Sequence, residues 1–267
     1  MCSKYQPKEL KETPFETRVK LLAKHNLHVC LEEIQKIKQA ITEGRLWELL
    51  ELRARGHPSL LQALSELDKH KELIEEYSPV SKERGLLYFG STGLARPEVT
   101  RHRKRLLERY IPPIGSEVLI LLPQTKTKPF HRSREVKRVL SKINHSIGER
   151  VSKLHVCIMA APFGVVPLEI DELYPLSQFE IALPPDNETL NYVSKQVVEY
   201  IMTHKYQVVI LHNDLKLLGD GVLNMCKKTC ETLGIKFLAG PAENKPWGKD
   251  AITRLVELVL DTIKNEL

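Results

Sequence analysis

The chain has 267 residues, 42% of them hydrophobic, and a formal net charge of +6. This composition supplies a core for one large domain or two modest ones and excludes a disordered chain. No apolar run approaches the roughly 20 residues of a membrane span, and the polar, charged first ten residues exclude a secretory signal peptide, so we expect a cytoplasmic protein with no membrane partner.

Helical patterns fill the first 80 residues. Apolar residues at helical spacing predict helices over residues 18–23, 31–41, 46–54 and 59–67. Gly44 and the His57–Pro58 pair separate them, since Pro58 fits the first turn of a helix. Trp47 and Leu50 fall on one helix face, and we expect both in a core.

The pattern changes after a short strand over 86–90, a basic helix over 96–110 and a Pro-rich linker over 111–115. Apolar strands then alternate with helices. The predicted strands are 117–122, 154–160, 178–183, 207–211 and 235–239. The predicted helices are 133–147, 188–204, 215–233 and 251–263. This alternation predicts a parallel sheet covered on both faces, in an α/β domain over 115–267 that follows a helical segment over 1–110.

Five cysteines are spread along the chain without the spacing of a disulfide framework: Cys2, Cys30, Cys157, Cys226 and Cys230. We expect them to be thiols, as in a reducing compartment. Cys226 and Cys230 lie four residues apart within a predicted helix, so we expect them to be small buried apolar groups.

Positive charge is concentrated in two windows. Residues 81–110 carry eight basic and three acidic side chains, and residues 121–140 carry six and one, so the rest of the chain is net acidic. Such clustering favours a polyanionic partner, most often nucleic acid. A merely solvated surface is the alternative.

The N-terminal segment contains sequence motifs of a known family. Residues 2–10 read Cys-Ser-Lys-Tyr-Gln-Pro-Lys-Glu-Leu, residues 21–27 read Leu-Leu-Ala-Lys-His-Asn-Leu, and 22 residues separate Cys2 from His25. With residues 37–48 and 88–90, these segments resemble archaeal tRNA-guanine transglycosylases. The zinc motif of that family is C-x-C-x-x-C, then 22 residues, then H.

The first two cysteines of that motif have no counterpart in this chain. A structural zinc takes four thiolate or imidazole ligands in a tetrahedron. The resemblance therefore implies Zn²⁺ held by Cys2 and His25 together with two cysteines of a partner, the N-terminal catalytic subunit of a split enzyme. A truncated piece of a longer chain is one alternative, and a Cys2 and His25 that hold no metal are another.

Enzymes of this family replace guanine 15 in the tRNA D-arm with 7-cyano-7-deazaguanine, using two aspartates on a (β/α)8 barrel. Nothing here resembles the segments that bear those aspartates, so we expect no catalytic residue in this chain. The resemblance implies instead that residues 1–110 complete the barrel and the zinc site of the partner, an archaeosine-forming enzyme. Its oligomeric order stays open.

The second domain resembles the post-barrel domain of these enzymes and of archaeosine synthase, through residues 121–133, 161–168 and 174–179. The synthase motif is P-C-x3-K-P-Y-x2-S-x2-H. Gln124, Phe130 and Val136 stand where that motif has Cys, Tyr and His. Because the thiol, the phenol and the imidazole are all missing, the synthase function is disfavoured.

A basic loop remains in this motif, between the end of a strand and a helix that Ser133 can cap. Its cations are Lys126, Lys128, His131, Arg132 and Arg134. Such positions favour anions, so we expect contact with tRNA phosphate; a solvated loop and a protein–protein surface are the alternatives. The helix over 96–110 adds four further candidates, Arg101, Arg103, Lys104 and Arg105, which cannot all share one face.

Three functions are consistent with these observations. The first is a non-catalytic subunit of a tRNA pentosyltransferase that binds tRNA and completes a zinc site. The second is a stand-alone tRNA-binding protein, and the third is a synthase-like enzyme.

Overall fold

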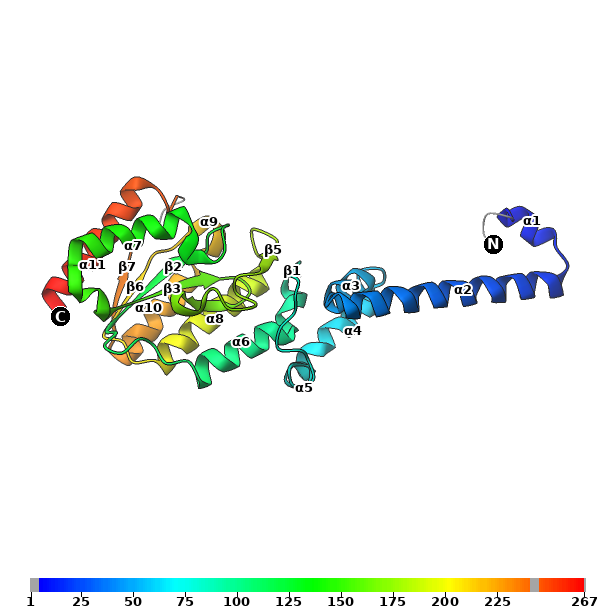
Figure 1. The fold of residues 1–267 in the computed structure, drawn as a ribbon, viewed down its shortest axis with the longest axis horizontal. Helices are drawn as coiled ribbons and strands as arrows, with labels where there is room; N and C mark the ends of the chain where they lie inside the picture. Colours follow the sequence, from blue (N-terminus) through cyan, green and yellow to red (C-terminus); the bar gives the residue numbers. More distant parts are fainter. Residues whose placement is uncertain (1–4, 241–244, 267) are drawn as a thin grey trace.

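The computed structural model describes residues 5–240 and 245–266. A layered α/β body carries a helical arm that projects from it (Figure 1). The arm consists of α1 (Pro7–Glu12) and the 28-residue α2 (Phe15–Thr42), about 42 Å long. The two helices predicted over 18–23 and 31–41 are therefore one helix, because no Gly or Pro interrupts the chain between its ends.

Short helices connect the arm to the body. They are α3 (Leu46–Ala54), α4 (Pro58–Glu66) and α5 (Lys71–Glu76). The first two match the prediction closely. Trp47 is buried as expected, and its indole N–H donates to Glu51 Oε1 at 3.2 Å. Leu50 is 39% exposed, so the prediction that it lies in a core is wrong.

The main sheet has the strand order β4-β3-β2-β6-β7. Its strands are β2 (Val118–Pro123), β3 (Leu154–Ala160), β4 (Gly164–Pro167), β6 (Val208–Leu211) and β7 (Lys236–Ala239). In the register, Val118 lies opposite Leu154 on one side and Val208 on the other, in parallel pairs. The strand β4 runs antiparallel to β3, so the predicted wholly parallel sheet is wrong at this edge.

Helices cover both faces of the sheet, as predicted. The helices α7 (Arg134–Ile147) and α11 (Lys249–Glu266) lie on one face, and α8 (Asn187–Thr203) and α10 (Gly221–Leu233) lie on the other. Side chains of β2 alternate between the two cores, with Ile120 in the first and Leu119 in the second.

The helix predicted over 215–233 is interrupted. It consists of α9 (Leu215–Leu218) and α10, separated at Gly219, whose φ of +65° favours glycine. Cys226 and Cys230 are fully buried in α10, as expected, and burial raises the pKa of the Cys230 thiol to about 11.

A second, two-stranded sheet links the segment that follows α5 to the body. In it, β1 (Leu86–Tyr88) pairs in parallel with β5 (Phe179–Ile181), so the strand expected over 178–183 lies outside the main sheet. The helix α6 (Pro97–Glu108) packs against α8. The predicted linker over 111–115 is a loop, but β1 and α6 pack on the body although they precede it.

Short 3-10 helices complete the chain: η1 (Leu67–His70), η2 (Ser91–Ala95), η3 (Phe130–Arg132), η4 (Gly148–Lys153) and η5 (Leu168–Ile170). Across the described residues, none of the helices combines the length and the apolar character needed to cross a bilayer.

Candidate functional site

The structure describes only one of the two predicted zinc ligands. Cys2 lies outside the described residues, and His25 lies half-buried on α2. The described residues hold no group of three or more His, Cys, Asp or Glu side chains arranged to bind a metal. Because a structural zinc needs four ligands, the site predicted at Cys2 and His25 stays a prediction that requires ligands from elsewhere.

The arm exposes apolar side chains in two rows. Phe15, Val19 and Leu22 recur at positions i, i+4 and i+7 near the start of α2, so they share a face. Ile34, Ile37 and Ile41 recur at i, i+3 and i+7 near its end. All six are exposed, from 42% at Leu22 to 71% at Phe15. Exposed apolar surface of this extent marks an interaction surface, and we call these six residues the α2 stripe.

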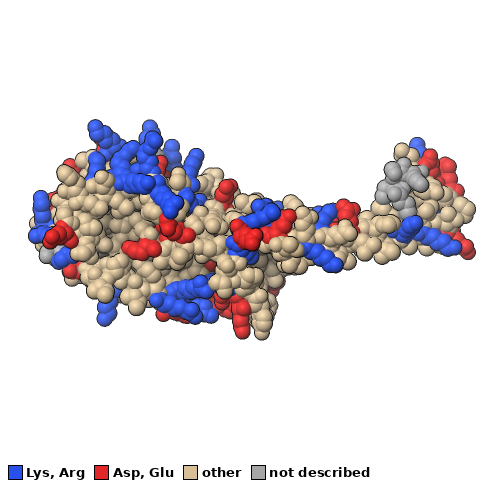
Figure 2. Space-filling model, in the orientation of Figure 1, with Lys and Arg blue, Asp and Glu red and all other residues tan. Residues whose placement is uncertain are grey.

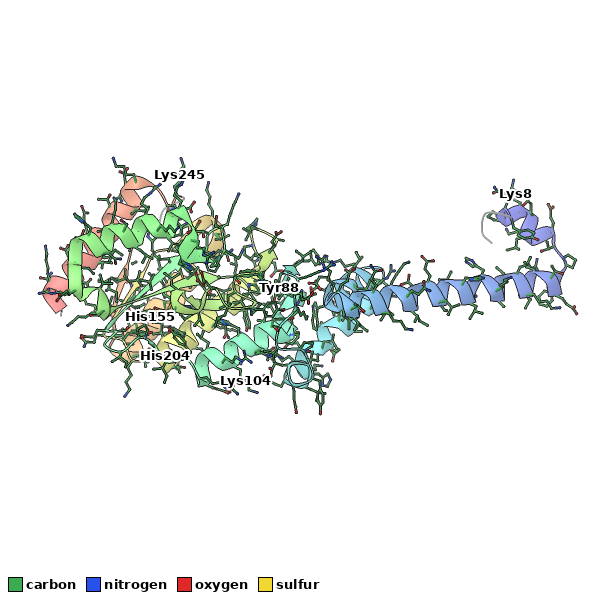
Figure 3. The ribbon with its side chains drawn as sticks, viewed as in Figure 1. Lys8, Tyr88, Lys104, His155, His204 and Lys245 are labelled. Carbon is green, nitrogen blue, oxygen red and sulfur yellow. The ribbon has the colours of Figure 1, made fainter. Side chains whose placement is uncertain are left out.

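Arg96 is fully buried, and its guanidinium lies over the ring of Tyr88 on β1. Figure 3 shows Tyr88 on the side of the body that faces the arm. The Arg96 guanidinium donates to Glu48 Oε1 and to the carbonyl oxygen of Leu87, both at 2.8 Å. Glu98 lies close by. Burial alone would raise the pKa of its carboxyl, but Lys82 and Arg96 together lower it. These charge-assisted bonds fix α3, β1 and α6 relative to one another.

Two of the arginines predicted to contact RNA on α6 bond within the protein. Arg101 is 7% exposed and bonds Glu75 and the carbonyl oxygens of Glu75, Ser78 and Pro79. Arg103 donates two hydrogen bonds to Glu199, at 2.6 and 3.0 Å. We therefore leave Arg101 out of any RNA-binding surface, because its donors are used internally.

Lys104 and Arg105 on the same helix are exposed to solvent. Lys104 Nζ lies 3.9 Å from Glu75, at the limit of an ion pair. Among the described residues, no carboxylate pairs with Arg105. Lys104 and Arg105 are thus the two α6 candidates whose charge is presented to a ligand.

The basic loop after β2 is partly neutralised. His131 Nδ1 lies 2.6 Å from Asp171, and Arg132 forms an ion pair with Glu172. Lys128 is half-buried with its ammonium 4.2 Å from the centre of the Phe179 ring, and burial lowers its pKa. The remaining loop cations predicted to contact RNA, Lys126 and Arg134, are exposed and have no carboxylate partner among the described residues.

Ser133 caps α7 as predicted, because its Oγ accepts the backbone N–H of Val136 at 3.2 Å. The three positions that depart from the synthase motif are structural. Gln124 Oε1 accepts the backbone N–H of Ala161 at 3.0 Å, and Phe130 and Val136 are fully buried in the core. None of these side chains can serve as a nucleophile or as an acid or base.

Sequence reasoning missed a buried polar network around His155 on β3. Its Nδ1 lies 2.6 Å from the Tyr206 hydroxyl, and its Nε2 lies 3.0 Å from that of Tyr110 and 3.4 Å from Cys157 Sγ. Burial raises the pKa of the Cys157 thiol well above its usual value, which opposes its use as a nucleophile. The network attaches the end of α6 to the sheet.

The protein is a doubly wound α/β domain with an attached helical arm, which exposes apolar side chains to solvent. The chain belongs to the family whose model is described as "Domain of unknown function (DUF5591)", which matches residues 99–259. A second model, described as queuine tRNA-ribosyltransferase, matches residues 1–59, which include the whole arm.

The curated relatives carry the name tRNA-guanine(15) transglycosylase. The protein of Methanobrevibacter smithii is 37% identical over 234 residues, which are 86% of this chain and 34% of that protein. That of Methanococcus vannielii is 38% identical over 78% of this chain and 30% of its own length. That of Saccharolobus solfataricus is 37% identical over 81% and 42%. The chain thus spans about a third of these relatives' length, and the resemblance to archaeal tRNA-guanine transglycosylases is confirmed.

One solved structure, described as AF0587, a protein of unknown function, overlaps 59% of this chain and 48% of its own, at 22% identity and a TM-score of 0.43.

Proposed function

We propose that this chain is the C-terminal subunit of a tRNA-guanine(15) transglycosylase. It supports the exchange of guanine for 7-cyano-7-deazaguanine in the tRNA D-arm by completing the barrel and the zinc site of an N-terminal catalytic subunit, and by binding tRNA. In this role it acts in the cytoplasm and contributes no catalytic residue of its own.

The observation that carries the proposal is the α2 stripe. It lies within residues 1–59, the segment similar to the queuine tRNA-ribosyltransferase model. The (β/α)8 barrel of such an enzyme is the occupant that this surface fits. Docking would remove apolar side chains from water and so drive association.

Zinc would couple this association to folding. Cys2 and His25 supply a thiolate and an imidazole, which suit Zn²⁺, and two thiolates from the partner would complete the tetrahedron. Metal binding to ligands from two chains stabilises the assembled state over the separate chains. The zinc is structural, and the chemistry of base exchange belongs to the partner.

The test is reconstitution from separately purified subunits. The catalytic subunit is incubated with radiolabelled guanine, a tRNA transcript and zinc, with and without this chain. We expect exchange of label into tRNA only when both chains are present. Equal exchange by the catalytic subunit alone would refute the proposal.

A further inference from the structure

The helix α7 separates its side chains by charge. Val136, Val139 and Ile143 are buried against the sheet. On the opposite side, Arg134, Lys137 and Arg138 are exposed at positions i, i+3 and i+4, so they share one face. This face presents three cations within about 6 Å along the helix axis.

These three cations differ from Arg101 and Arg103 of α6, whose charges are paired within the protein. Among the described residues, no carboxylate lies within ion-pair distance of Arg134, Lys137 or Arg138, whereas Arg101 and Arg103 pair with Glu75 and Glu199. Their charge is therefore available to an anion from outside.

Neighbouring segments enlarge the basic face. The helix α11 packs beside α7, with Lys142 Nζ 3.1 Å from Thr253 Oγ1. Lys249 at the start of α11 is exposed, and so is Lys245 just before it. Figure 2 shows basic side chains gathered over this part of the body. Lys245 and Lys104 project on opposite sides of the body (Figure 3), so Lys245 lies away from Lys104 on α6.

We propose that Arg134, Lys137 and Arg138, extended by Lys245 and Lys249, form the surface on which this subunit binds the phosphate backbone of tRNA. We call these five residues the α7 face. The inference rests on the proposed function for the identity of the polyanion. Because phosphates are recognised by charge and not by sequence, the α7 face would position the tRNA and not select it.

The chemistry of the surface favours RNA over a protein or a membrane. Large exposed apolar side chains, which the centre of a protein interface needs, are absent from the described part of residues 134–147 and 245–263. A helix that inserts into a membrane surface needs a free apolar side, but that of α7 is buried in the core. A face that carries cations without apolar groups fits a phosphate backbone.

The experiment compares two triple variants of the full chain for binding of a fluorescent tRNA transcript over a series of KCl concentrations. The first is R134Q/K137Q/R138Q. The control is K205Q/K227Q/K228Q, which removes the same charge from exposed lysines elsewhere on the body. Circular dichroism verifies that both variants fold.

We expect the α7 variant to raise the Kd for tRNA at least about tenfold, and to reduce the slope of log K against log salt by about 2–3, because three phosphate contacts are lost. The control should bind as the unmodified chain does. The proposal is overturned if both variants behave alike, if the unmodified chain does not bind tRNA, or if polyglutamate competes as well as unlabelled tRNA, which would indicate an acidic protein partner. Binding is measured on this chain alone, so failure to assemble with a catalytic subunit leaves the result unaffected.

Discussion

Replacing the apolar side chains of the α2 stripe should weaken association with the catalytic subunit. Ile34, Ile37 and Ile41 are 47%, 43% and 58% exposed. Full burial of such a side chain contributes about 1.5–3 kcal/mol, so covering the exposed half of all three contributes about 2–4 kcal/mol. At about 1.4 kcal/mol per tenfold, I34A/I37A/I41A should raise the Kd about 30- to 700-fold.

Titration calorimetry of the two purified chains with zinc present measures this Kd. The matched control, L183A/M202A/L233A, removes exposed apolar side chains from the body. Alanine has the higher helix propensity, so the stripe variant should keep its own stability. An unchanged Kd for the stripe variant, or an equal loss in the control, would refute the assignment of α2 as the docking surface.

Two further predictions concern the stability of the chain itself. The variant R96L removes the buried cation between Glu48 and Glu98. Its free energy of unfolding should fall by about 3–5 kcal/mol, and its urea midpoint by about 1–2 M. A midpoint equal to that of the unmodified chain would contradict the role given to Arg96. Burial lowers the pKa of His102 to about 4 in the folded chain. Between pH 6.5 and about 4, the imidazole therefore binds a proton in the unfolded chain but not in the folded one. The folded state loses stability as the pH falls through this range. Between pH 7 and 5 the free energy of unfolding should fall by about 2 kcal/mol. The variant H102Q can still donate a hydrogen bond to the Val165 carbonyl oxygen, and its free energy of unfolding in urea should depend less on pH. An unchanged pH dependence in H102Q would count against His102 as its source.

Local sequence signals predicted most elements of the body. The mostly apolar runs within 117–122 and 154–160 predicted buried strands, and Ser133 identified the start of α7. Non-local pairing could not be predicted in this way. The strand β5 pairs with β1, which lies more than 90 residues earlier, and β4 is a four-residue strand that follows directly on a turn.

The candidate site, too, could be predicted from the sequence only in part. The two basic windows, residues 81–110 and 121–140, indicated where cations gather, and the second includes Lys137 and Arg138 of the α7 face. They could not indicate which cations are free, because that depends on distant carboxylates and carbonyl oxygens. Arg101 and Arg105 lie one turn apart on α6, yet the first is enclosed by residues 75–79 and the second is exposed.

The most direct test of the account is the zinc content of the assembled complex of this chain with its catalytic subunit. Elemental analysis should find one zinc per complex, and neither chain alone should retain it after dialysis. C2S and H25A should each lower the zinc content and loosen the assembly. A complex that keeps its full zinc content in both variants would contradict a site shared between the two chains.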